Sequence, residues 1–187
     1  MLSISNASVQ DRILAAAASC VVDFGVDRVT LAEIARRAGV SRPTVYRRWP
    51  DTRAVLAALL TSHIVETLAE VPIRGRGRAA LVNRVVEVAE RLRGDELVMA
   101  VLRSELALVY IAQRLGSSQQ MLIDALASDL RAAQRDGTVR SGDPRQLAAM
   151  VLLITQSTIQ SAQIVRPILN ADELAAELAY SLNGYLS

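Results

Sequence analysis

Residue types that often mark catalytic, metal-binding or secreted proteins are scarce in this chain of 187 residues. It has one cysteine and one histidine. A single cysteine excludes an internal disulfide framework and a cysteine-rich zinc site. The single histidine has no second histidine with which to complete a metal site or an acid–base pair. Lysine is absent, so all 21 basic residues are arginine, as a GC-rich genome that favours arginine codons would produce.

Motifs for export and catalysis are also missing. No N-terminal stretch combines a basic start with an uninterrupted apolar run, so we expect a cytoplasmic protein. There is no glycine-rich phosphate loop and no Gly-x-Ser-x-Gly elbow, and the acidic residues show no pairing that suggests carboxylate catalysis. We therefore predict that the chain is not an enzyme, binds no metal and needs no cofactor.

The positive charge is concentrated in one segment. Residues 28–53 carry seven arginines against two carboxylates, a net charge of +5, whereas residues 1–27 have a net charge of −2 and residues 54–187 a net charge of −1. A basic run is often only a solvated face. A local excess of arginine is nevertheless what contact with nucleic-acid phosphates requires.

The spacing of apolar residues is helical throughout, and strand-like alternation is nearly absent, so an all-α fold is predicted. Ser8 and Gly25 bound a first helix over residues 9–24. Its apolar face is predicted to consist of Ile13, Leu14, Ala17, Val21 and Phe24. Half of the chain is apolar, which suffices for a sizeable core, and the lone Cys20 is predicted to belong to that core.

The next helices are short and have clear boundaries. Thr30 with Glu33 has the form of a capping box and opens a helix over residues 31–38. A third helix follows Ser41, with Pro43 in its first turn. Asp51 caps a fourth helix, which ends at about Glu70. The helices predicted beyond the break at residues 72–78 cover residues 79–93, 95–114, 117–136, 144–165 and 172–186.

The stretch of residues 147–165 is uncharged, so a membrane span has to be considered. Polar side chains crowd its second half and argue against lipid exposure. We instead predict a helix buried on several sides, by its own core and by a partner subunit. With the apolar stripe of residues 174–185 on the final helix, this predicts a four-helix bundle between two subunits.

The pattern within residues 30–48 meets the requirements of a helix-turn-helix. Closely crossing helices need a small residue, which is Ala35, and the turn needs a residue that tolerates positive φ, which is Gly39. The apolar side chains spaced to lock the second helix onto the first are Ile34, Val40 and Val45. The exposed side chains at the start of the second helix, where base edges are read, are Arg42, Thr44, Arg47 and Arg48.

With these residues in place, the sequence resembles the tetracycline-repressor (TetR) family of bacterial regulators. The resemblance is carried by VTLAEIARRAGVSRPTVYRRWP at residues 29–50 and extends back to Ile13 and forward to Leu56. It departs from the family pattern at Arg48-Trp49, where His-Phe is common, and at Thr52, where a lysine is common. Trp49 still fills the apolar corner, whereas the missing lysine removes one phosphate contact.

This resemblance implies an N-terminal three-helix DNA-binding domain over residues 1–50, a connecting helix over residues 51–71, and a C-terminal ligand-binding and dimerisation domain over residues 72–187. It implies a homodimer that binds a double-stranded DNA operator. Such proteins are usually repressors that a small-molecule effector releases from a palindromic operator. No membrane partner is implied.

The resemblance also assigns roles to single residues. Thr30 resembles the cap whose hydroxyl and neighbouring amide meet a phosphate, and Tyr46 matches the tyrosine whose hydroxyl reaches the DNA backbone. Arg42 and Arg47 are predicted to contact bases, because a guanidinium pairs bidentately with guanine. Pro43 and Thr44 match the exposed start of the recognition helix. Phosphate anchors or solvent-facing charges are expected at Arg28, Arg36 and Arg48.

Candidates for an effector pocket rest on weaker patterns. His63 shares a helical face with leucines and is either ordinary packing or close to a pocket. An apolar stripe from Met99 to Tyr110 is either core or pocket lining. A glutamine strip at residues 156–163 faces a cavity or the partner helix, or is paired within the core. The predicted pocket residues are His63, Met99, Leu102, Leu106, Tyr110, Gln156 and Gln160.

Two other classes remain as alternatives to a regulator. The first is a helical ligand-binding or scaffold protein that does not bind DNA, for which the slope of log affinity for duplex DNA against log salt concentration would be near zero. The second is an enzyme, which would require turnover that a single substitution of His63 abolishes.

Overall fold

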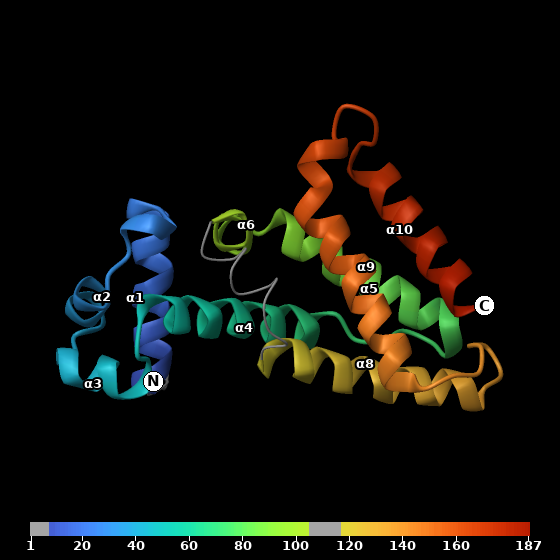
Figure 1. The fold of residues 1–187 in the computed structure, drawn as a ribbon, viewed down its shortest axis with the longest axis horizontal. Coiled ribbons are helices and arrows are strands. Elements are labelled where there is room, and N and C mark those ends of the chain that lie inside the picture. The colour runs from blue at the N-terminus through green and yellow to red at the C-terminus, as the bar shows by residue number, and fades with distance from the viewer. Residues whose placement is uncertain (1–7, 105–116) are drawn as a thin grey trace, which may run out of the picture. The chain divides into compact units, whose positions relative to one another are not determined.

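The computed structural model describes residues 8–104 and 117–187, and within these residues every regular element is helical. The elements are α1 (Val9–Phe24), η1 (Val26–Arg28), α2 (Leu31–Ala38), α3 (Arg42–Arg48), α4 (Thr52–Glu70), α5 (Gly77–Gly94), α6 (Glu96–Arg103), α8 (Ser117–Arg135), α9 (Pro144–Val165) and α10 (Ala171–Leu186) (Figure 1). The predicted all-α fold is confirmed.

The helix boundaries follow from local capping. The Ser8 hydroxyl accepts a hydrogen bond from the amide of Asp11, the Asp11 carboxylate accepts one from the amide of Ser8, and α1 ends where Gly25 takes a φ of 76°. All but one of the predicted helices agree with the observed ones to within two residues at each end. The exception is the helix predicted over residues 95–114: α6 ends at Arg103, and Ser104 forms a bend whose amide donates to the carbonyl of Val101 at 3.2 Å. Residues 105–114 lie outside the described part.

The described residues form two compact units, and α4 contributes to both. Residues 8–64 and 96–104 form the first, called the N-terminal unit below. Residues 65–95 and 117–187 form the second, called the C-terminal unit. The chain passes from one unit to the other within α4, after Ile64.

The N-terminal unit has a continuous apolar core. The side chains of Ile13, Ile34, Val45 and Val55 have 0% exposed surface, and Cys20 is equally buried. Four helices and the turn between α2 and α3 therefore close around a single cluster, to which α6 adds Val101. One residue of the predicted apolar face differs: Phe24 is 41% exposed. The Arg37 guanidinium lies over its ring, 4.6 Å from the centroid, and this contact stabilises an aromatic ring at the surface.

In the C-terminal unit, α8 packs on α9, and α10 packs on α5 and α9. The loop between α8 and α9 is held by the Gln134 amide, which donates to the carbonyls of Arg140 and Gly142 at 3.0 Å each. The Arg140 guanidinium donates in turn to the carbonyl of Tyr185 at 2.8 Å. Side-chain donors thus tie this loop to the last turn of α10.

Helix α9 is long and apolar enough to cross a membrane by length and composition alone, a test that core helices of soluble proteins also pass. Of the two faces of α9 predicted to be buried, by the chain's own core and by a partner subunit, one is buried within a single chain. Its buried residues are Leu147, Ala148, Val151 and Ile159, whereas Leu153 is 58% exposed and Ile164 is 79% exposed. A single copy therefore covers one face of α9 only.

Candidate nucleic-acid interface

The first helix of the predicted motif starts at Thr30. Its hydroxyl oxygen accepts a hydrogen bond from the amide of Glu33 at 3.2 Å, as an N-cap should. The other half of the predicted capping box is replaced, because the Glu33 carboxylate accepts hydrogen bonds from Arg36 and Arg37 instead. The Thr30 hydroxyl proton is not used by this cap.

The turn depends on Gly39, which has a φ of 64° and a ψ of 37°. This left-handed conformation lets the amide of Val40 reach the carbonyl of Ala35 at 3.1 Å, closing α2 and redirecting the chain. A side chain at position 39 would meet no atom within 4 Å. Glycine is therefore required there by the backbone conformation and not by lack of space.

The second helix, α3, is capped by Ser41, whose hydroxyl accepts from the amide of Thr44 at 3.3 Å. Pro43 lies in its first turn, where the amide it lacks is not needed. Its inner side is fixed by Val45, which is fully buried, and by Trp49, which is 9% exposed after the helix ends. Ile34 and Ala35 of α2 are buried beneath it, and Val40 packs against the same core. All the predicted packing residues of the motif therefore lie in the turn or against the core.

The outer side of α3 is cationic and open. Arg42, Pro43, Arg47 and Arg48 are exposed, and Tyr46 is 53% exposed. Thr44 is partly buried, and its hydroxyl lies 2.7 Å from that of Ser41. Arg48 donates to the side-chain oxygen of Gln10 in α1 at 3.2 Å. The guanidinium groups of Arg42 and Arg47 have no hydrogen-bond or ion-pair partner among the described residues.

Two other arginines of the basic segment are neutralised. Arg36 donates to both carboxylate oxygens of Glu33, at 2.8 and 2.6 Å. Arg37 donates to the same carboxylate at 2.9 Å, to the Ser19 hydroxyl at 2.7 Å, and to Asp23. The hydrogen bonds from Arg36 and Arg37 lower the pKa of Glu33 to about 2. Three arginines of the same segment, Arg42, Arg47 and Arg48 of α3, have no carboxylate partner among the described residues.

Sequence reasoning did not anticipate the contacts of Arg37 with α1. The spacing of Glu33 to Arg36 and Arg37, three and four residues apart, was a visible signal for the contacts within α2. Asp23 and Ser19 lie 14 and 18 residues before Arg37. No local pattern connects residues so far apart, and only the packing of α1 against α2 brings them together.

The predicted pocket residues are divided between the two units. Met99 is buried, and His63 and Leu102 are partly buried, in the N-terminal unit. Gln156 and Gln160 are partly buried in α9 of the C-terminal unit. Leu106 and Tyr110 lie outside the described residues.

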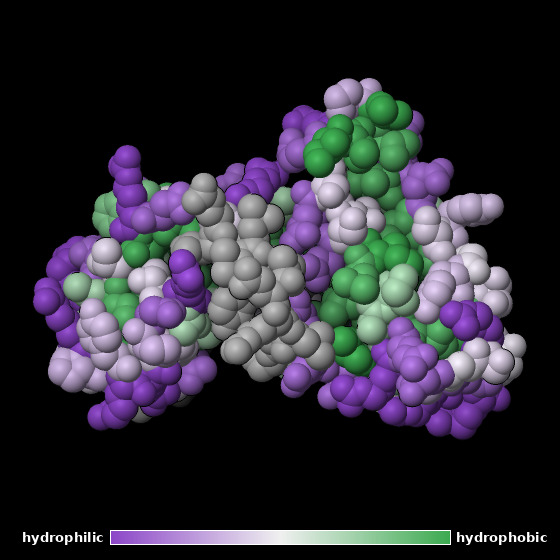
Figure 2. All heavy atoms as spheres, in the orientation of Figure 1, coloured by the Kyte–Doolittle hydropathy of each residue, from purple (hydrophilic) through white to green (hydrophobic). Residues whose placement is uncertain are grey.

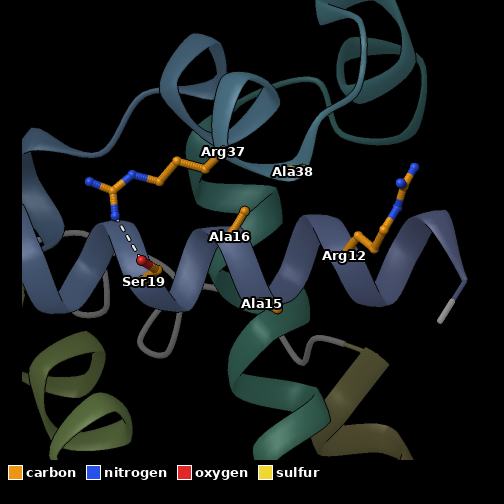
Figure 3. A pocket seen from close by; sticks show the side chains of 6 residues that line it. All are labelled: Arg12, Ala15, Ala16, Ser19, Arg37 and Ala38. Carbon is orange, nitrogen blue, oxygen red and sulfur yellow. Dashed lines mark hydrogen bonds between the residues drawn. The ribbon is translucent and has the colours of Figure 1, made fainter. Parts of the chain in front are cut away.

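A hollow that the structure does describe lies on the surface of α1 and α2 (Figure 3). Its volume is about 520 Å³, and it is lined by Arg12, Ala15, Ala16, Ser19, Arg37 and Ala38. The hydrogen bond from Arg37 to Ser19 crosses one end of it. None of the predicted pocket residues lines it. Within the described residues, no group of three or more His, Cys, Asp or Glu side chains could hold a metal ion.

Comparison with known proteins agrees with this geometry. Residues 13–59 match the family described as bacterial regulatory proteins, tetR family. This span begins in the core of α1 and includes α2, the turn and α3. Over 188 aligned positions, the chain is 68% identical to the HTH-type transcriptional regulator Rv2250c of Mycobacterium tuberculosis (strain ATCC 25618 / H37Rv), and the alignment covers 100% of both proteins.

Solved structures share the fold at low identity. The transcriptional repressor QsdR of R. erythropolis, from the TetR family, has a TM-score of 0.71 and 18% identity over 96% of each chain. The regulator FadR of Bacillus subtilis, in complex with stearoyl-CoA, has a TM-score of 0.67 and 17% identity over 94% of this chain and 98% of FadR. The chain therefore belongs to the TetR family of bacterial regulatory proteins and is a DNA-binding transcriptional regulator.

Proposed function

We propose that two copies of the chain bind a near-palindromic operator through α3, and that a small molecule held by the C-terminal helices releases them, so that the regulator acts as a cytoplasmic repressor. The observation that carries this proposal is the outer side of α3, where two arginines with no partner among the described residues lie on a helix fixed by a buried core. Recognition of base edges in a DNA groove requires exposed cationic side chains on a helix that is held in place.

Within this proposal, Arg42 and Arg47 read base edges, because each guanidinium is free to donate two parallel hydrogen bonds to one guanine. The Thr30 hydroxyl and the first amides of α2 meet a phosphate, which the positive end of the helix dipole also favours. Tyr46 and Arg48 contact the DNA backbone, and Pro43 and Thr44 set the approach of the first turn of α3. Phosphate contacts of this kind position the protein, whereas the base contacts specify the sequence.

The second copy is proposed to cover α9 and α10. Hydrophobic residues gather over the end of α9 and its connection to α10 (Figure 2). Ile164 is 79% exposed, Ile168 is 81% exposed and, on α10, Tyr180 is 78% exposed. A contiguous apolar surface of this kind marks an interaction site, and a twofold axis would let the same surface cover itself. Dimerisation would then place two recognition helices about 34–36 Å apart, one turn of DNA.

The effector is proposed to be apolar or amphipathic, because α9 carries no charge from Leu147 to Val165. Its pocket is proposed to include the predicted residues on α4, α6 and α9, with Leu106 and Tyr110. FadR of Bacillus subtilis, which shares the fold, has been solved with stearoyl-CoA, so stearoyl-CoA is a concrete first probe. Release of DNA requires that the probe bind the DNA-incompetent state more tightly than the competent one.

The central experiment measures DNA affinity. A duplex operator is selected from a random pool by the wild-type protein, and its affinity is measured over a range of salt concentrations. Arg47→Ala and Arg42→Ala should each weaken binding by about tenfold or more, since a bidentate base contact contributes about 1–3 kcal/mol. Arg131→Ala, which removes an exposed arginine of the C-terminal unit, is the matched control. Unchanged affinity in both α3 variants would refute the contact assignment, and a salt slope near zero would favour a scaffold protein.

A further inference from the structure

Helix α4 is the structural link between the two units. Its first half packs in the N-terminal unit, where Val55, Leu56 and Leu59 are buried in the core. Its last turn belongs to the C-terminal unit. One helix of 19 residues is therefore shared by the two units. A group that holds the last turn of α4 acts on the same helix that contributes to the N-terminal core.

The last turn of α4 lacks a backbone donor. The final carbonyls of a helix have no partner unless another group supplies one. In a continuing helix, the carbonyl of Leu68 would accept from the amide of residue 72. That residue is Pro72, which has no amide hydrogen. Val71, which directly follows the helix, is only 1% exposed, so water is a poor substitute at this position.

Arg84 of α5 supplies the missing donors. Its Nη2 donates to the carbonyl of Leu68 at 3.1 Å and its Nε donates to the carbonyl of Val71 at 2.8 Å. A cation at this position also faces the negative end of the α4 dipole. The third branch of the same planar group, Nη1, donates to Asp129 of α8 at 3.2 Å. One guanidinium therefore joins the end of α4 to both α5 and α8.

The surroundings of the Arg84 guanidinium make its removal costly for the structure. The side chain of Arg84 is 24% exposed and that of Asp129 is 28% exposed. Burial raises the pKa of Asp129 even though Arg84 acts in the opposite direction. Removing the guanidinium would therefore leave a desolvated carboxyl group and two carbonyls without their donors. A lysine could not replace it, because one ammonium cannot span three acceptors in a plane.

A second arginine contacts the same turn in a different manner. Arg91 donates to the side chains of Glu70 at 3.2 Å and Glu87 at 2.9 Å, and its own side chain is 43% exposed. It contacts no backbone carbonyl of α4. Exposed pairs of this type contribute little, so Arg91 provides a matched control on the same helix end.

We propose that Arg84 is the positioning residue through which the C-terminal unit holds α4 and through which DNA binding is transmitted to that unit. This inference rests on the proposed function, in which α4 carries the signal between DNA and effector. Linkage requires the transmission to be reciprocal. If the end of α4 governs DNA affinity, DNA bound at the other end must stabilise the last turn of α4.

The test is amide hydrogen exchange on the full-length protein, with and without a duplex selected by the wild-type protein. In the wild type, bound DNA should slow exchange at residues 66–71. In Arg84→Met that protection should fall by about tenfold, the change expected from losing one charge-assisted hydrogen bond. Asp129→Asn, which keeps the shape of the acceptor and removes its charge, should lose part of the protection, and it remains informative if Arg84→Met folds poorly. Arg91→Met should keep the full effect.

The outcomes separate this inference from the proposed function. Equal DNA-induced protection in wild type, Arg84→Met and Asp129→Asn would overturn the role of Arg84 alone. A wild-type protein that binds the duplex without any protection at residues 66–71 would overturn transmission through α4, and the inference with it. Faster exchange at these residues in Arg84→Met without DNA, with the DNA effect intact, would show a merely structural cap and would also overturn it.

Discussion

The two units differ in how completely contacts within one chain bury their apolar side chains. The N-terminal unit buries Ile13, Ile34 and Val45 fully within one chain. The C-terminal unit leaves much of α9 open, with Leu153 58% exposed and Ile164 79% exposed. The difference teaches that contacts within one chain complete the apolar core of the N-terminal unit, whereas in the C-terminal unit they leave an apolar surface that the proposed dimer would cover.

The largest expected effect tests the open surface of the C-terminal unit. If two copies associate as proposed, changing Leu153 and Ile164 together to Asp should convert the dimer to a monomer, because burying two unpaired charges costs several kcal/mol. Sedimentation velocity measures the association state. Val22→Asp is the matched control, since Val22 is 75% exposed in the N-terminal unit and should leave association unchanged. If the double variant still sediments as a dimer, the second copy does not bind this surface.

The second prediction tests the closed core of the N-terminal unit. Ile34→Ala should lower the free energy of unfolding by about 3 kcal/mol, because it leaves a cavity in a packed core. Urea denaturation followed by circular dichroism measures it. Val22→Ala, again on the exposed side of α1, should change stability by about 0.5 kcal/mol or less. Similar losses in the two variants would mean that Ile34 does not lie in a tight core.

A third prediction compares one glycine from each unit. Gly39→Ala should cost about 1 kcal/mol, from the backbone conformation alone. Gly77→Ala should cost more than this, because its φ is 71° and a Cβ there would lie 2.7 Å from the Thr138 hydroxyl oxygen. In double-mutant cycles with Thr138→Ala, Gly77→Ala should therefore show coupling and Gly39→Ala none. Coupling at neither glycine would argue against the close approach of α5 to the loop between α8 and α9.

The smallest expected effect concerns the charge network on α2. Because Arg36 and Arg37 lower the pKa of Glu33 from 4.5 to about 2, its ionised form stabilises the folded state above pH 4.5, and this stabilisation is lost as the pH falls towards 2. Glu33→Gln should thus be less stable than wild type at pH 7, and the difference should shrink between pH 4.5 and 2. Melting temperatures across this range measure it.

The control for this experiment is Glu90→Gln, which removes an exposed carboxylate of α5 that has no ion pair among the described residues. Its difference from wild type gives the background pH dependence. A Glu33→Gln difference that stays constant from pH 7 to 2 would show that the pairing with Arg36 and Arg37 does not stabilise the fold. Added salt should also reduce the Glu33 effect, since the group is near the surface.

Much of the helical framework could be predicted because its determinants are local. Ser8, Thr30 and Asp51 each accept a hydrogen bond from an amide three residues later, and a pattern of that length is visible in the sequence. Gly25 and Gly39 mark helix ends for the same reason. A grouping of the candidate effector residues could not be predicted in this way, because these residues come from separate helices whose relative placement no short pattern encodes.

The sequence by itself determined the boundaries of the helices, the capped and glycine-closed motif from Thr30 to Arg48, and the set of arginines available to it. Only the tertiary structure decided which of those arginines are neutralised, through contacts such as that of Arg37 with Asp23, and that Arg84 replaces the amide missing at Pro72. The reason is the range of the forces involved. Capping and turn formation act within one helical turn, whereas the partner of a guanidinium depends on which helices pack together.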